Sequence, residues 1–257
     1  MSAAINVPTC LALIPARAGS KRVLSKNTKL LNGHPMLAYT IAAALDSSIF
    51  QRVIVSTDNE EIAAIARQYG AHVPFLRPAM MATDQSPDIE WLSHLLMKLR
   101  ESGEAADCFS ILRPTSPFRQ PETIQRAWNA FVADGLADSL RAVEKCTQHP
   151  AKMWQIQGNR MTPVMSNPDS SGTPWHSMPY QSLPPVYAQN ASLEVAWCRV
   201  PLEKGSIAGE TILPFVTEGY EGFDINTPED WIVAEYLVHE GLATLPKLPV
   251  LAQSGVK

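Results

Sequence analysis

The stretch Leu11–Asn27, LALIPARAGSKRVLSKN, combines an apolar run, a Gly-Ser turn and a cluster of cations. Five of the 21 Lys and Arg residues lie between Arg17 and Lys29, and the first acid of the chain is Asp46. A turn at the end of a strand exposes backbone N–H groups, and Gly19 admits close approach of a ligand. The segment therefore predicts a strand that ends in a phosphate-binding turn, with a solvated basic loop as the alternative.

Three cations of this turn, Arg17, Lys21 and Lys26, can converge on a triphosphate. Ser20 and Asn27 add uncharged hydrogen-bonding groups. The segment contains neither G-x-x-x-x-G-K-[ST] nor G-x-G-x-x-G, which disfavours P-loop kinases and Rossmann dehydrogenases.

The composition is that of a globular chain large enough to bury a core. It has 257 residues, 46% of them hydrophobic, and a formal net charge of −4. The acidic balance argues against nucleic acid as a general partner. No apolar stretch is long enough to cross a bilayer and no secretory signal is evident, so we expect a soluble, cytoplasmic protein. Cys10, Cys108 and Cys198 lie in apolar runs and are expected to be buried thiols.

The first 140 residues alternate between short apolar runs and amphipathic stretches. Strands are expected at 11–15, 52–57 and 108–112, and helices at 36–45, 89–99 and from Pro121. Asp58 is expected to cap a further helix, with Glu61 three residues on in a capping-box arrangement. This alternation predicts an α/β fold, a mainly parallel sheet with helices on both faces. Ligands in such folds bind at the carboxyl ends of the strands.

The pattern changes after about Lys145. Residues 152–161 predict a β-hairpin that turns at Gly158-Asn159. Six prolines between Pro163 and Pro185 predict an extended arm or loop. Strands are expected again at 191–200 and 211–217, followed by a helix that Thr227 caps and Pro228 opens.

The segment GFDINTPED, residues 222–230, predicts a metal site. Asp224 and Asn226 are two residues apart on a short extended segment, so both side chains point to the same face. Such a pair can hold a hard divalent ion that bridges phosphate oxygens. The alternative is that Asp224 serves only to form a turn. Thr227 and the acids that follow it are better explained by helix capping.

Two further loops carry polar residues. In RPTSPFR, residues 113–119, two prolines stiffen the loop and are expected to expose Arg113, Thr115, Ser116 and Arg119. Arg77 and Asp84 lie in another loop between a strand and a helix. Neither loop by itself indicates which substrate is bound.

The ordered motifs IPARAGSKR…KN, STDNEEIA, LRPAMMATD, RPTSPFR and DINTPEDW resemble the acylneuraminate cytidylyltransferase family, the CMP-sialic acid synthetases and their relatives. The resemblance covers roughly residues 11–236. It implies that CTP reacts with a 2-keto-3-deoxy acid sugar in the presence of Mg²⁺, giving the CMP-sugar and pyrophosphate. It also implies a Rossmann-like fold of the nucleotide-diphospho-sugar transferase type, with an inserted dimerisation arm that reaches across a homodimer.

The resemblance further implies boundaries and roles. The nucleotide-binding domain would span 8–144, the dimerisation and acceptor-binding arm 145–200, the rest of the α/β domain 201–242, and a loose tail 243–257. Catalysis would depend on Arg17, Lys21 and Lys26. The nucleotide would contact Arg17, Ser20, Lys21, Lys26, Asn27, Arg77, Asp84 and Asp88. The acceptor would contact Arg113, Ser116, Lys152, Gln189 and Asn190. The metal would be held by Asp224 and Asn226.

The chain departs from the family pattern at several of these positions. Sialic acid synthetases often have a second Asp where Asn226 stands, and they tend to have Gln in place of Arg113. Arginines of the arm that commonly meet the acid sugar align with Tyr180 and Ala188. These differences favour an acceptor other than N-acetylneuraminic acid, such as legionaminic acid, pseudaminic acid, an aminated 3-deoxy-octulosonate or a phosphonate. Two alternatives are a nucleotidyltransferase that uses another nucleotide or a sugar phosphate, and a non-catalytic nucleotide-binding relative.

Overall fold

The computed structural model describes residues 7–19, 22–168 and 172–249. The chain divides into two compact units. The main body comprises Met1–Ala142 and Asn190–Lys257, and the inserted unit comprises Val143–Gln189.

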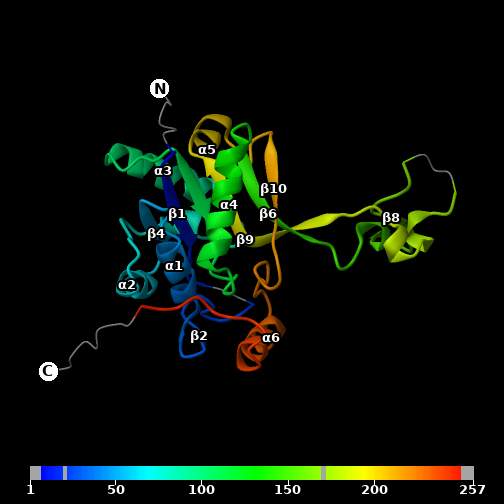
Figure 1. The fold of residues 1–257 in the computed structure, drawn as a ribbon, viewed down its shortest axis with the longest axis horizontal. Coiled ribbons are helices and arrows are strands. Elements are labelled where there is room, and N and C mark those ends of the chain that lie inside the picture. Colours follow the sequence, from blue (N-terminus) through cyan, green and yellow to red (C-terminus); the bar gives the residue numbers. More distant parts are fainter. Residues whose placement is uncertain (1–6, 20–21, 169–171, 250–257) are drawn as a thin grey trace. The chain divides into compact units, whose positions relative to one another are not determined.

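The main body is built on a six-stranded sheet with the order β10-β6-β9-β5-β1-β4 (Figure 1). The strands are β1 (Cys10–Pro15), β4 (Arg52–Ser56), β5 (Cys108–Ile111), β6 (Ser139–Lys145), β9 (Tyr187–Trp197) and β10 (Ile212–Val216). β1 pairs in parallel with both β4 and β5, whereas β9 runs antiparallel to β5. The predicted α/β fold is therefore confirmed.

Helices cover both faces of this sheet. They are α1 (Met36–Asp46), α2 (Glu60–Gln68), α3 (Asp88–Glu101), α4 (Pro121–Asp134) and α5 (Arg199–Lys204). Because successive side chains of a strand point to opposite faces, β1 contributes to two cores. Cys10, Ala12 and Ile14 pack with residues of α1, α2 and α4. Leu11 and Leu13 pack with residues of α3 and α5.

The expected helices and strands of the first 140 residues are present within one or two residues of their predicted bounds. The helix N-cap at α2 is the exception. Asn59, not Asp58, precedes the helix, and its side chain accepts the backbone N–H of Ile62 at 2.9 Å. Asp and Asn both favour the N-cap position and these two are adjacent in the sequence, so spacing alone does not show which of them caps the helix. Asp58 has another function, which is described with the site.

The buried cysteines were also predicted correctly. Cys10, Cys108 and Cys198 are free and buried. Burial raises the pKa of the Cys198 thiol to about 12, so this thiol is held in its neutral form.

A third cluster joins the start and the end of the main body. Thr227 caps α6 (Pro228–His239) and forms a capping box with Asp230, as the sequence predicted for these two residues. Trp231 of α6 packs with Leu31 of β2 (Leu30–Leu31), which pairs with β3 (His34–Pro35). Burial of this face fixes α6 beside the N-terminal segment that follows β1.

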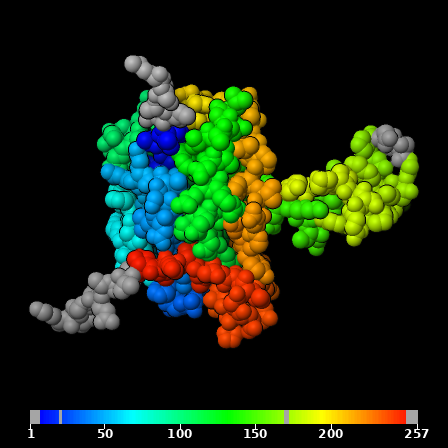
Figure 2. All heavy atoms as spheres, in the orientation of Figure 1, coloured from blue at the N-terminus to red at the C-terminus, as the bar shows by residue number. Residues whose placement is uncertain are grey.

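The expected loose tail is packed as far as Leu248. Figure 2 shows these C-terminal residues, in red, lying across the main body. Leu245 and Leu248 pack against the buried cluster around Trp231, and the side chain of Gln120 donates to the carbonyl oxygen of Thr244 at 2.6 Å. Apolar contact therefore overrides the tail's lack of regular structure, and residues 250–257 lie outside the described part.

The inserted unit contains the predicted hairpin, β7 (Trp154–Gln157) and β8 (Arg160–Pro163). The unit also contains the short 3₁₀ helices η2 (Pro150–Lys152), η3 (Trp175–Ser177) and η4 (Tyr180–Ser182). The buried His149 ring bonds to the carbonyl oxygen of Pro184 at 2.8 Å and accepts the N–H of Ala151. The described residues between prolines 163 and 185 otherwise form no long regular element, as their composition predicted.

The boundaries of the insertion differ from the predicted 145–200. Residues from Asn190 onward belong to the main body because β9 pairs with β5. The strand β6 and the helix α5 were not predicted, and the strand before α5 was predicted to run to residue 200 whereas β9 ends at Trp197. A short 3₁₀ helix, η1 (Ala79–Met81), lies between α2 and α3 in the main body. None of the described helices has the length and apolar character needed to cross a bilayer.

Candidate functional site

Five of the residues predicted to bind the nucleotide, Arg17, Lys26, Asn27, Arg77 and Asp88, gather at the carboxyl ends of β1, β4 and β5. A cavity of about 180 Å³ lies there. Its lining comprises Pro15, Arg17, Lys26, Asn27, Arg77, Asp88, Arg113, Pro114 and Thr115. An adjoining hollow of about 80 Å³ shares Arg17, Lys26 and Asn27. Segments far apart in the sequence thus place four cations around one space.

Hydrogen bonds fix the backbone of the turn that follows β1. The N–H of Ala18 donates to Asp58 Oδ1 at 2.7 Å, so Asp58 ties this turn to the end of β4. The buried Asn27 donates from Nδ2 to the carbonyl oxygen of Arg17 at 3.0 Å. Asn27 therefore supports the turn through a backbone contact. Ser20 and Lys21 lie outside the described residues.

Arg17 is paired with an acid in this structure. Its Nη1 lies 2.7 Å from Asp84 Oδ1 and donates to the carbonyl oxygen of Ala82 at 3.4 Å. The side chains of Arg17 and Asp84 are each 35% exposed, so the pair stays accessible from solvent. A phosphate that binds Arg17 must share it with Asp84 or replace that acid.

Lys26 connects the turn to the predicted metal segment. Its Nζ donates to the carbonyl oxygen of Ile225 at 2.9 Å. Burial lowers the pKa of the Lys26 ammonium, while the Asp224 charge acts in the opposite direction. An ammonium that is poorly hydrated gains more from an anionic ligand than an exposed one.

Arg77 and Asp88 meet at one tryptophan. The buried Arg77 guanidinium stacks 4.7 Å from the ring centroid of Trp91 and donates to the carbonyl oxygen of Ser56 at 2.9 Å. Burial lowers the pKa of Arg77 to about 10. The indole Nε1 of Trp91 donates to Asp88 Oδ1 at 2.7 Å. Packing therefore holds Arg77 at the cavity wall.

Arg113 forms two ion pairs. Its Nη2 lies 2.6 Å from Asp88 Oδ2 and 3.1 Å from Glu194 Oε1. Burial alone would raise the pKa of Asp88, but the charge of Arg113 and hydrogen bonds from Trp91 and Arg113 bring it below its usual value. Both partners are thus charged near neutral pH.

The loop that carries Arg113 is anchored from beneath by Arg119. This residue is 1% exposed and donates to the carbonyl oxygens of Ser192 and Arg113 and to the hydroxyl of Thr40. Burial lowers the pKa of Arg119 to about 9. Carbonyl oxygens and the Thr40 hydroxyl accept from its two Nη groups, while its buried Nε has no partner among the described residues. Arg119, which the sequence predicted to be exposed, is therefore a structural cation of this loop.

Asp224 has a carboxylate oxygen that suits a cation. Its Oδ1 is buried and has no hydrogen-bond partner among the described residues. Its Oδ2 accepts the Nδ2 of Asn226 at 2.5 Å. In this arrangement Asn226 presents its donor to Asp224, and its amide oxygen becomes available only after the amide turns. Asp230 is committed to the backbone N–H groups of Asn226 and Thr227, each at 2.8 Å.

The residues predicted to meet the acceptor are not all brought together. Ser116 is buried and does not line the cavity. Asn190 is also buried and donates to the hydroxyl of Thr217 at 2.8 Å. Lys152 belongs to the inserted unit, where its Nζ donates to the carbonyl oxygens of His176 and Met178, and Gln189 ends that unit.

Sequence reasoning missed two residues that contact the site. Glu194 is 4% exposed and pairs with Arg113, and its Oε2 also contacts Nη1 of Arg141 on β6. An acid in the middle of the apolar run ASLEVAWC was a signal that could have identified Glu194. A buried carboxylate needs a cation, and no local pattern indicated which one.

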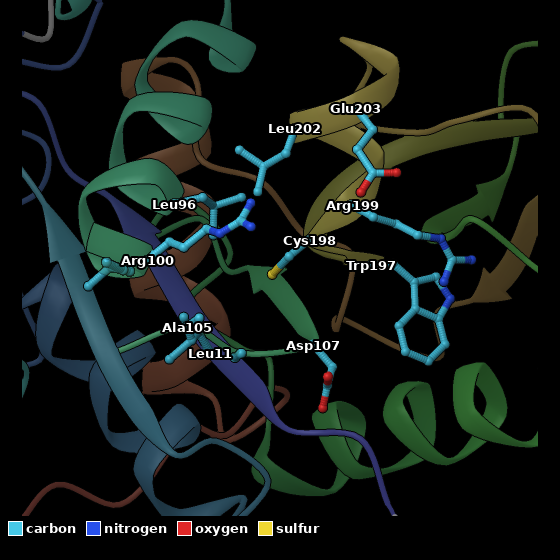
Figure 3. Close-up of a pocket in the computed structure, with 12 residues that line it drawn as sticks. Leu11, Leu96, Arg100, Ala105, Asp107, Trp197, Cys198, Arg199, Leu202 and Glu203 are labelled. Carbon is cyan, nitrogen blue, oxygen red and sulfur yellow. The ribbon is translucent and has the colours of Figure 1, made fainter. Parts of the chain in front are cut away.

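A larger cavity of about 340 Å³ lies elsewhere in the main body (Figure 3). Leu96 and Arg100 of α3, Cys198, and Leu202 of α5 surround it. It adjoins the amino-terminal part of β1, and none of the predicted site residues lines it. The cavity of about 180 Å³, which contains predicted site residues, is therefore the candidate active site.

Several known proteins are similar to this chain. Residues 11–150 match the model of a family described as cytidylyltransferase. CMP-N,N'-diacetyllegionaminic acid synthase of Legionella pneumophila is 39% identical over 231 residues, which is 89% of this chain and 95% of that protein. N-acylneuraminate cytidylyltransferase of Escherichia coli is 45% identical over 117 residues, 46% of this chain and 27% of that protein.

A solved structure has the same fold. CMP:2-keto-3-deoxy-manno-octonic acid synthetase complexed with CTP aligns with a TM-score of 0.66 at 13% identity. The alignment covers 91% of this chain and 99% of that one. The region that matches the family model, residues 11–150, contains every residue that lines the cationic cavity of about 180 Å³.

Proposed function

The chain belongs to the cytidylyltransferase family, and from this premise we propose that it activates an acid sugar of the nonulosonic type with CTP. The products are the CMP-sugar and pyrophosphate. One observation carries the proposal. Arg17, Lys26, Arg77 and Arg113 line a single cavity at the strand ends of the matched region.

The described residues suit in-line transfer of a cytidylyl group. The anomeric hydroxyl oxygen of the acceptor bonds to the α-phosphorus, the bond to the pyrophosphate oxygen breaks, and the hydroxyl proton leaves. Arg17 and Lys26 hold the phosphates and stabilise the charge that develops on the departing oxygen. Lys21 would share this role, which is assigned to it only by the resemblance to the family. The backbone bonds from Asp58 and Asn27 keep the turn in place, which limits the reorganisation needed during the reaction.

Asp224 is the residue that would hold Mg²⁺. The buried, unpartnered Oδ1 of Asp224 fits a hard cation, which in such sites commonly binds one or two carboxylates together with substrate phosphates. When bound, the ion would neutralise phosphate charge. Lys26 donates to the carbonyl oxygen of Ile225, the residue next to Asp224, which supports a site where the cationic turn and the carboxylate act on one set of phosphates.

N,N'-diacetyllegionaminic acid is the acceptor that we favour. The synthase of that sugar matches nearly its whole length, whereas the E. coli sialic acid enzyme matches over 27% of its length. The departures at Arg113, Tyr180 and Ala188 from the sialic acid pattern point in the same direction.

A pyrophosphate-release screen tests the proposal. Purified protein, CTP and Mg²⁺ are combined with legionaminic, pseudaminic and sialic acids and with 3-deoxy-octulosonate. We expect release only when an acceptor is present, with the diacetylated legionaminic acid preferred. Arg17→Ala should abolish turnover in the same assay. Release that is independent of any acceptor would contradict the assignment.

The nucleotide is tested separately. Thermal shifts with the four common nucleoside triphosphates should show the largest stabilisation with CTP. A preference for UTP or GTP would favour the alternative of another nucleotide. CTP binding without turnover of any acceptor would favour the non-catalytic alternative.

We also propose that the protein is a cytoplasmic homodimer that pairs through its inserted unit. The hairpin places Ile156 opposite Met161, and these side chains are 75% and 57% exposed. An isolated two-stranded hairpin is marginally stable in water, and an exposed apolar pair favours a covering surface. Light scattering should report twice the mass of one chain, and Ile156→Asp with Met161→Asp should yield the monomer. A wild-type monomer at micromolar concentration would contradict the proposal.

A further inference from the structure

Two carboxylates hold Arg113 at one corner of its guanidinium group. Asp88 and Glu194 both contact Nη2, at 2.6 and 3.1 Å. Among the described residues neither carboxylate takes the Nε or Nη1 donors, and Arg113 lines the cavity with a side chain that is 28% exposed. Because the guanidinium group is planar, holding that plane sets the directions in which these remaining N–H groups point.

The two acids differ in their surroundings. Asp88 is 35% exposed at its side chain and opens α3, whereas the side chain of Glu194 is 5% exposed in the middle of β9. Glu194 also contacts Arg141, so this buried carboxylate is shared by two arginines. Two acids and two arginines leave the group without net charge, which satisfies the requirement for burying Glu194.

The backbone of the Arg113 loop does not depend on Glu194. Arg119 donates to the carbonyl oxygen of Arg113, and the N–H of Ile225 donates to that of Thr115 at 2.9 Å. The contact with Glu194 therefore acts on the direction of the Arg113 side chain more than on the path of the loop.

We propose that Glu194 is a positioning residue for acceptor recognition. With Asp88 it fixes the plane of the Arg113 guanidinium group, so that the remaining N–H groups, on Nε and Nη1, are presented to the acid sugar. The inference rests on the proposed function. It assigns a role to a buried residue on β9 that no sequence motif includes, and it predicts that acceptor binding and CTP binding respond differently to the same change.

The primary test is Glu194→Gln, which keeps the shape of the side chain and removes its charge. We expect the KM for the acceptor to rise about tenfold, the size of effect that the loss of a charged hydrogen-bond partner produces. The Kd for CTP, measured by calorimetry, and kcat should stay within about twofold, since Glu194 acts only through Arg113. Glu194→Asp keeps the charge and should recover part of the loss. Glu144→Gln, an exposed acid at the end of β6, is the matched control.

A double-mutant cycle with Arg113→Gln shows whether Glu194 acts through Arg113. In the Arg113→Gln background, Glu194→Gln should change the acceptor KM by less than about twofold, because the two residues share one interaction. Additive effects on KM would overturn the proposal. An equal weakening of CTP and acceptor binding by Glu194→Gln would also overturn it, because a general structural role would act on both ligands.

The same four proteins can be compared without substrate. The decreases in melting temperature from Glu194→Gln and Arg113→Gln should be less than additive in the double variant. Additive decreases would overturn the inference even if no acid sugar were turned over. A wild-type protein that turns over no acceptor, with non-additive melting temperatures, would instead contradict the proposed function and retain the ion-pair arrangement.

Discussion

Arg17 and Asp84 form an ion pair, with Arg17 Nη1 2.7 Å from Asp84 Oδ1, at the position where the sequence predicts triphosphate binding. The acid neutralises a cation that the nucleotide requires. An exposed pair of this kind is worth about 0.2–1 kcal/mol, so a phosphate can replace it at a modest cost.

Asp84→Asn should therefore bind CTP more tightly, by up to about fivefold, because exposed ion pairs contribute at most about 1 kcal/mol. The gain should shrink as salt is raised, since salt screens both interactions. Calorimetric titration at two salt concentrations checks this. Asp46→Asn, an exposed acid at the end of α1, should have no effect. Weaker binding by Asp84→Asn would show that Asp84 contacts the nucleotide directly.

Asp224→Asn should lower kcat by about 100-fold or more and raise the Mg²⁺ concentration needed for half-maximal rate, by analogy with the loss of a single charge-stabilising group. Asn226→Asp should act in the opposite direction on the Mg²⁺ requirement, because it adds a carboxylate beside Asp224. Rates measured over a magnesium titration check both. Glu229→Gln, in the first turn of α6, is the control, and an Asp224→Asn enzyme with full activity would exclude the assigned metal ligand.

The pKa of Asp88 predicts a pH dependence of stability. Its folded-state pKa lies below the usual value of 3.8, so the ionised carboxylate stabilises the fold at pH values above that value. This stabilisation is lost as the pH falls through the lowered pKa. Urea unfolding of wild type and Asp88→Asn should therefore differ at pH 7, and the difference should begin to shrink only below about pH 4. A difference that grew on acidification would contradict the sign of the shift.

Gly209 lies against Asp138 with a φ of +69°. A Cβ at this position would lie 2.4 Å from the Cβ of Asp138. The carboxylate of Asp138 accepts hydrogen bonds from the backbone N–H of Glu210 and from the ammonium group of Lys204. Gly209→Ala should destabilise the protein by about 2–4 kcal/mol, the sum of left-handed backbone strain and overpacking. Gly205→Ala, at φ +62° with open space, should show only the backbone part of about 1–2 kcal/mol. Denaturant midpoints distinguish the two, and equal losses would contradict the contact argument.

Local patterns predicted most elements of the main body. The apolar run of β1 and the Pro121 start of α4 depend on neighbours in the sequence, and both were predicted correctly. The choice between Asp58 and Asn59 as cap was not determined by spacing, because Asp58 is needed by Ala18, 40 residues away. Asp58 bonds to Ala18 in the folded chain, and Asn59 is left to cap the helix.

The candidate site followed the same rule. The cations of the turn after β1 could be predicted from their density. The Arg113–Glu194 pair could not, because it joins residues 81 positions apart through a strand that reaches the sheet after the insertion. The packed segment at Leu248 was missed for a related reason, since its partners lie in the cluster around Trp231.

The strands that enter and leave the inserted unit, β6 and β9, are neighbours in the sheet, and the N–H of Cys146 donates to the carbonyl oxygen of Val186 at 2.9 Å just beyond them. The two ends of the excursion are therefore adjacent. A short turn in place of residues 147–185 could join these two ends, so a protein without this segment would show whether the proposed pairing depends on it.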